Sequence, residues 1–97
     1  MQPIQTQYES IIEEEVTLTQ RISLCKDSID ILLEYISRHA DSIHILTAED
    51  IVTTIHAMAQ NLDTELLHVR FEKGILEHKL HELQLQANLH SATVQSS

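Results

Sequence analysis

Hydrophobic residues in the first half of the chain recur at alternating spacings of four and three positions. Ten positions keep this spacing without a break, and nine are apolar: Ile4, Tyr8, Ile11, Glu15, Leu18, Ile22, Cys25, Ile29, Leu32 and Ile36. A repeat held for about four and a half heptads keeps one stripe of a helix facing a partner along a left-handed supercoil. The pattern predicts a coiled-coil helix over residues 8–39, preceded by a lead-in over residues 1–7.

A second helix is predicted over residues 48–89, after a connection over residues 40–47 that interrupts the repeat. Thr47 offers a capping hydroxyl, and Asp50 supplies an acid three positions later, which is a typical helix start. The second seam is expected to comprise Ile51, Ile55, Met58, Leu62, Leu66, Val69, Lys73, Leu76, Leu80 and Leu83. Two successive spacings of four around Leu62 predict a stutter, which locally unwinds a supercoil.

Two long helices joined by about eight residues predict an antiparallel hairpin. If paired residues have numbers that sum to 87 or 88, Glu15 lies opposite Lys73, and these are the only charged residues on either seam. A shift of about half a heptad would place Lys73 beside Leu18 instead. Residues 90–97 lose both charge and period, so they are predicted to form a flexible tail.

Further apolar residues flank both seams, for example Ile12 and Val16 on the first helix and Leu67 on the second. An apolar arc wider than a two-stranded seam implies more than one helical neighbour. We therefore predict an all-α fold in which an antiparallel two-helix coiled-coil hairpin completes a three- or four-helix bundle with other chains.

Composition and charge narrow the classes of partner. One Gly and one Pro in 97 residues are too few for the turns of an all-β fold. Fifteen acidic and six basic residues give a net charge of −9 without a basic cluster, so we expect no direct nucleic-acid binding and no attraction to an anionic membrane. The longest apolar run is three residues, so we expect no membrane insertion and an intracellular protein of the cytoplasm or nucleus.

Candidate chemistry is sparse. Glu65 and His68 have the Glu-x-x-His spacing of di-iron bundles, but the required second copy is missing. His78 and His81, three apart on one helix face, could belong to a zinc site, but we expect them to lie on a solvated face. Cys25 lies on the seam, where a thiol packs as a small hydrophobe, with an intermolecular disulfide or a reactive thiol as alternatives.

The sequence therefore predicts no catalytic, cofactor-binding or metal site and no small-molecule substrate. Adjacent carboxylates over residues 13–15 point in different directions on a helix and do not form an acid–base pair. The expected function is a non-enzymatic helical interaction subunit of a multi-subunit complex with kinetochore-, tether- or coactivator-like architecture, whose partners are protein helices. The alternative is a self-contained homodimeric four-helix bundle that acts as a regulator or adaptor.

Overall fold

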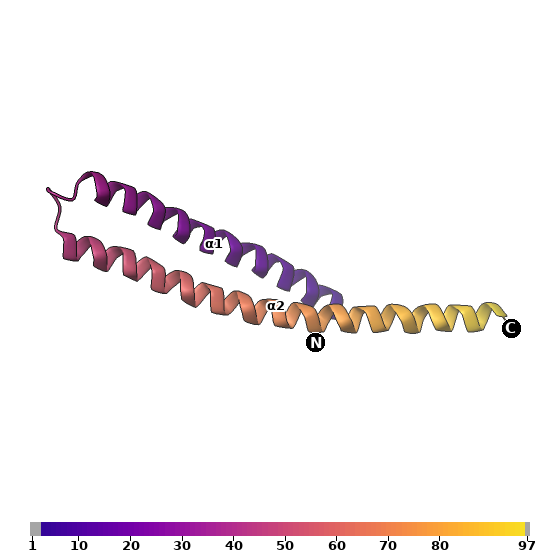
Figure 1. The fold of residues 1–97 in the computed structure, drawn as a ribbon. Coiled ribbons are helices and arrows are strands. Elements are labelled where there is room, and N and C mark those ends of the chain that lie inside the picture. The colour runs from indigo at the N-terminus through magenta and orange to yellow at the C-terminus, as the bar shows by residue number, and fades with distance from the viewer. Residues whose placement is uncertain (1–2, 97) are drawn as a thin grey trace.

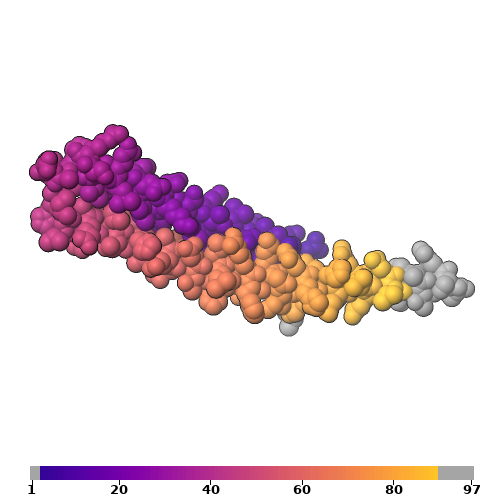
Figure 2. All heavy atoms as spheres, viewed as in Figure 1, coloured from indigo at the N-terminus to yellow at the C-terminus, as the bar shows by residue number. Residues whose placement is uncertain are grey.

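The structure, a computed structural model, describes residues 3–96, and side chains are described up to residue 89. It consists of two helices, α1 (Ile4–Arg38) and α2 (Ile45–Ser96). They lie side by side as an antiparallel hairpin (Figure 1 and Figure 2), the molecule extends about 83 Å along its long axis, and no strand occurs among these residues. The all-α class and the helical hairpin are thereby confirmed, while the bundle with other chains stays a prediction.

Helix α1 begins four residues before the predicted start, so the expected lead-in is helical from Ile4 onward. Pro3 precedes the helix with φ −58° and ψ 151°, and its carbonyl accepts a hydrogen bond from the Gln7 N–H at 3.0 Å. The fixed φ of proline favours a helix start at this point, where its missing N–H is not needed. The helix ends at Arg38, and the His39 ring stacks on Tyr35 with centroids 4.3 Å apart.

Helix α2 begins at Ile45, and its cap is His44, not the predicted Thr47. The Thr47 N–H donates a hydrogen bond to His44 Nδ1 at 3.1 Å, and Thr47 Oγ1 lies 2.8 Å from the same nitrogen. The first helical hydrogen bond runs from the Ala48 N–H to the His44 carbonyl at 3.0 Å. An imidazole acceptor thus satisfies an N–H of the first turn, which is the task of an N-cap side chain. The connection is correspondingly short, from residue 39 to residue 44.

The core lies in the middle of the hairpin. The nine buried side chains of the described residues are Ile11, Leu18, Ile22, Cys25, Ala59, Leu62, Leu66, Val69 and Leu76. Toward the connection, the seam side chains are partly buried, and an apolar hollow lies between the two helices there. The hairpin therefore closes its own core in the middle and leaves it open near the connection.

The seam of α2 differs from the predicted one in its first half. Ala59 is buried, whereas Ile51 and Met58 are 45% and 50% exposed. The seam observed is Ala48, Val52, Ile55, Ala59, Leu62, Leu66, Val69, Lys73, Leu76 and Leu80. These positions alternate four and three without a break, so the predicted stutter is wrong. The prediction selected the larger apolar residues, but one continuous phase places a small side chain at residue 59.

The register of the hairpin is the one in which residue numbers sum to 87 or 88. Lys73 Nζ donates a hydrogen bond to Glu15 Oε1 at 2.9 Å, so the alternative that shifts Lys73 toward Leu18 is not adopted. In this register the first residue of α1 reaches the level of Leu83. Helix α2 continues past that level to Ser96, as Figure 1 shows. Residues 90–96 continue α2, residue 97 lies outside the described residues, and the predicted flexibility of the tail stays a prediction.

Candidate protein-interaction surfaces

The hairpin leaves more large apolar side chains in contact with water than it buries. Fifteen large hydrophobic residues among those described are exposed, against nine buried core residues. Soluble monomers rarely expose contiguous apolar patches of more than a few hundred Å². Many of the exposed side chains gather in two surfaces, one beside the connection and one on the back of α2.

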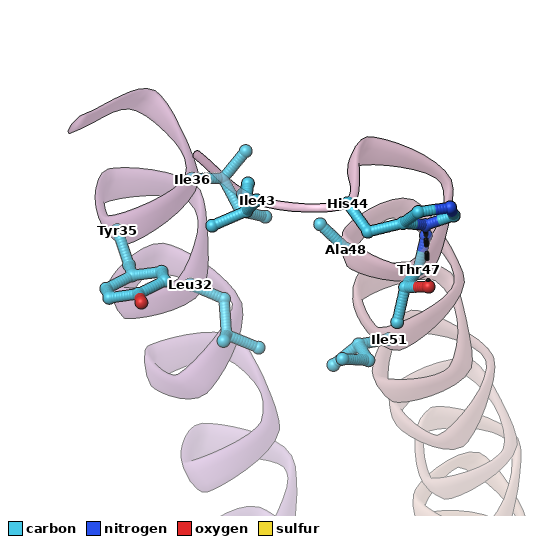
Figure 3. A pocket seen from close by; sticks show the side chains of 8 residues that line it. All are labelled: Leu32, Tyr35, Ile36, Ile43, His44, Thr47, Ala48 and Ile51. Atoms are coloured by element: carbon cyan, nitrogen blue, oxygen red, sulfur yellow. Dashed lines mark hydrogen bonds between the residues drawn. The ribbon is translucent and has the colours of Figure 1, made fainter. Parts of the chain in front are cut away.

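The first surface begins at a hollow of about 200 Å³ where the two helices separate next to the connection. In Figure 3, Leu32 and Ile36 of α1 and Ile43 of the connection lie opposite Ala48 and Ile51 of α2, with open space between them. The polar side chains of this end, His44 and Thr47, bond to each other at the rim. The hollow is therefore an apolar opening between the two helices, at the end of the seam next to the connection.

Exposed apolar residues extend this hollow along both helices. Tyr35 also lines a neighbouring hollow with Ile31, and Leu24 lies seven residues before Ile31 on the same helix face. On α2, Met58 lies seven residues after Ile51. We call these five residues, Leu24, Ile31, Tyr35, Ile51 and Met58, the loop groove. Their exposed fractions run from 45% to 68%, so the hairpin itself covers little of this face.

The second surface runs along the back of α2, opposite the seam. Phe71, Ile75, His78, Glu82, Leu85 and Leu89 follow one another at alternating spacings of four and three. We call these six residues the outer stripe. Its apolar members are 42–69% exposed, and His78 Nε2 lies 3.1 Å from Glu82 Oε1 at its centre. A second heptad repeat on one helix is typical of a helix that contacts neighbours on two sides.

Two further residues adjoin the outer stripe. Leu67, one turn before Phe71, is 67% exposed. Gly74 lies beside Phe71 and Ile75, and a Cβ at this position would meet no atom within 4 Å. The hairpin therefore does not need a glycine at residue 74 for its own packing. A surface glycine between apolar residues permits close approach by an external backbone.

A polar layer interrupts the seam of the hairpin. Glu15 accepts hydrogen bonds from Lys73 Nζ at 2.9 Å and from Arg70 Nε at 3.2 Å. These two cations hold the pKa of Glu15 below its ordinary value, Lys73 having the larger effect, and the bond to Glu15 raises the pKa of Lys73. One heptad before Glu15, the Tyr8 hydroxyl donates to Glu77 Oε1 at 2.9 Å, which raises the pKa of Tyr8.

The residues predicted for the two seams fall into three groups in the structure. Eight are buried, namely Ile11, Leu18, Ile22, Cys25, Leu62, Leu66, Val69 and Leu76. Ile4, Tyr8, Glu15, Ile29, Leu32, Ile36, Ile55, Lys73 and Leu80 are partly buried. Ile51, Met58 and Leu83 are exposed. The prediction missed Ala59 in the seam and did not identify the outer stripe, although the spacing of the stripe was readable in the sequence.

Histidine, cysteine and acidic side chains are the possible metal ligands of this chain. Among the side chains described up to residue 89, His, Cys, Asp and Glu form no group of three that could hold a metal ion. Cys25 is a buried free thiol. Within the described part of the chain, neither helix has a stretch long and apolar enough to cross a membrane. Comparisons with protein-family models, curated proteins and solved structures found no match for this chain.

Proposed function

We propose that this chain is a non-enzymatic helical scaffold subunit, which joins a multi-subunit complex by packing its exposed apolar surfaces against helices of other proteins. The architectures that we consider closest are those of kinetochore, tethering and coactivator complexes. The buried free thiol of Cys25 suits a reducing compartment, so we infer the cytoplasm or the nucleus. The acidic net charge of −9 favours partner helices with basic flanks.

The outer stripe is the observation that carries this proposal. Its apolar residues contribute nothing to the core of the hairpin, yet they keep the spacing of a packing interface along Phe71–Leu89. A helix that only faced water on this side would be expected to be polar there. A partner helix laid along the stripe would cover Phe71 and Ile75 at one end and Leu85 and Leu89 at the other.

The alternative function is a self-contained homodimeric four-helix bundle that acts as a regulator or adaptor. The loop groove favours it, because two hairpins would complete a bundle at the end where one hairpin is open. The two functions differ in what covers the outer stripe. A scaffold subunit has this stripe covered by another protein, whereas an isolated dimer leaves it in water.

Introducing negative charges at the first residue of the outer stripe and at the adjoining Leu67 tests the proposal. The double variant Leu67→Glu, Phe71→Glu changes two residues that are 67% and 69% exposed. The control Gln60→Glu, Thr64→Glu places the same charges one heptad earlier on exposed polar positions. Tagged chains are expressed in their own cells, and the native mass of the complex is measured by size exclusion with light scattering. We expect wild type and control to migrate in one large complex and the first variant to leave it.

Two results would contradict the scaffold role. The first is an equal native mass for wild type, variant and control, which would show that Phe71 of the outer stripe and the adjoining Leu67 do not lie in an interface. The second is a wild-type chain no heavier than two copies, about 22 kDa from twice 11.1 kDa. In that case the self-contained dimer would be the function that remains.

A further inference from the structure

We propose that the loop groove is covered by the loop groove of a second copy of this chain. The two hairpins would point the same way, with both connections at one end of a four-helix bundle. This inference deepens the proposed function, because it names the first partner of the scaffold subunit. The outer stripe stays free for other proteins.

The exposed area of the loop groove approaches the size that a stable dimer needs. Its five residues are 45–68% exposed, which corresponds to roughly 500 Å² per copy if each presents about 180 Å² when free, within the range of about 150–250 Å² for large side chains such as Tyr35. Two such faces and their rims come close to the range of about 1,200–2,000 Å² buried in a stable interface. The hollow of about 200 Å³ provides room for side chains of the second copy.

The position of the loop groove favours a symmetric contact between two copies at the end of the hairpin that holds the connection. Its apolar residues come from both helices and stop at about the level of Leu24 and Leu62. Beyond that level, the same face carries Arg21 and Glu65 and then Glu14 and Glu72. With both connections at one end, α1 of each copy lies over α2 of the other. Arg21 then faces Glu65 of the second copy, and this pair marks the border of the contact.

The opposite orientation fits the charges less well. If the connections were at opposite ends and the grooves were centred on each other at Ile31, Arg38 would lie over Leu24 of the second copy, because both are seven residues from Ile31. Arg38 already pairs with Glu34, Nη2 to Oε1 at 2.6 Å. Burial of that pair against a leucine would cost desolvation without a new partner. The parallel arrangement avoids this contact.

The mass of the purified full chain tests the dimer. We expect about 22 kDa for wild type, from twice 11.1 kDa, and about 11 kDa for Leu24→Glu, Ile31→Glu at the same concentration. The control Ser10→Glu, Thr17→Glu carries the same charges at exposed positions two heptads earlier on the same face, and it should remain a dimer. Leu67→Glu, Phe71→Glu should also remain a dimer. A helical wild-type monomer at all concentrations would overturn the proposal.

A variant in which two side chains of the loop groove are shortened to alanine distinguishes dissociation of the dimer from unfolding of the chain. Leu24→Ala, Ile31→Ala retains good helix formers, so its helicity by circular dichroism should match that of wild type. We expect its dimer dissociation constant to rise at least tenfold. An unchanged constant would contradict the proposed contact. If the purified chain forms no such dimer, the scaffold function is still tested independently by the native mass of the chain in cells. The two proposals can therefore fail separately.

The orientation has its own readout. A pyrene label is attached to Ser42→Cys in a Cys25→Ala background, after the helicity and the mass of that background have been checked. Ser42 is exposed in the connection, outside both helices, and its hydroxyl donates to the His39 carbonyl at 3.2 Å, so the helicity of the labelled chain is checked as well. Connections at the same end predict excimer fluorescence in the dimer, which is lost in Leu24→Glu, Ile31→Glu. A dimer without excimer emission would overturn the parallel arrangement.

Discussion

Lys73 donates a hydrogen bond to Glu15 across the hairpin, with Nζ 2.9 Å from Oε1. The two residues are the only charged members of the seams, and the other oxygen of Glu15 accepts a bond from Arg70 at 3.2 Å. A slip of either helix along the other would separate the acid from both bases and place Lys73 against apolar side chains. The pair is therefore best understood as a device that specifies register.

The first prediction concerns pH. Lys73 and Arg70 lower the pKa of Glu15 in the folded chain, so its contribution to stability is present above the unfolded pKa of about 4.3 and is lost as pH falls through the lower folded pKa. Urea unfolding of wild type and Glu15→Gln should therefore differ at pH 7, and the difference should shrink as the pH falls below about 4. Parallel profiles over this range would show that the carboxylate has no preferred partner in the fold.

The second prediction tests the unbroken seam of α2. Ala59→Asp places a charge at a position that is 4% exposed, and we expect a loss of about 3 kcal/mol or more. Both changes are made in the Leu24→Glu, Ile31→Glu background, which lacks the proposed dimer contact, and there Met58→Asp, at 50% exposure, should cost less than about 1 kcal/mol. Urea unfolding at one protein concentration measures both. The reverse order of the two effects would restore the seam with a stutter.

The third prediction concerns the cap of α2. His44→Ala removes the acceptor of the Thr47 N–H, and we expect a loss of about 1 kcal/mol in the free energy of unfolding. His44→Asn supplies another capping oxygen and should recover most of it. His56→Ala, at an exposed position inside α2, is the control. Equal stability of wild type and His44→Ala would contradict the assignment of His44 as the cap.

The fourth prediction concerns Gly74. The residue has no positive φ and open space around its missing Cβ, so Gly74→Ala should stabilise the purified chain by about 0.5–1 kcal/mol. The reciprocal change Ala57→Gly, at an exposed position of the same helix, should destabilise it by a similar amount. If Gly74→Ala is destabilising in the purified chain, the glycine has a neighbour that the single hairpin lacks.

The sequence was sufficient for the hairpin because many apolar residues of a repeated pattern support it. It left two registers open, one with Glu15 opposite Lys73 and one shifted by about half a heptad, and the hydrogen bond between these two residues decides between them. Ala59 could not be recognised, since a small residue next to Met58 gives little hydrophobic signal. Whether Met58 or Ala59 occupies the seam depends on the whole of α2, because an unbroken repeat must keep one stripe of the helix facing α1 along its full length.

The helix boundaries were harder to predict for a local reason. Thr47 has the better capping chemistry by type, but His44 offers Nδ1 at the right distance once Ile45 is helical. The outer stripe was missed because His78 and Glu82 interrupt its apolar repeat, which is weaker than the repeat of the seam. The partners of the two exposed surfaces depend on other chains, which no pattern within this chain specifies.

The native mass of the wild-type chain in extracts of its own cells, measured beside that of the purified chain, tests the scaffold role most directly. We expect a complex in cells that is clearly heavier than the purified protein, because helices of other proteins cover the outer stripe. An equal mass in both samples, with full helicity in the purified chain, would contradict it. The exposed residues from Phe71 to Leu89 would then have no partner.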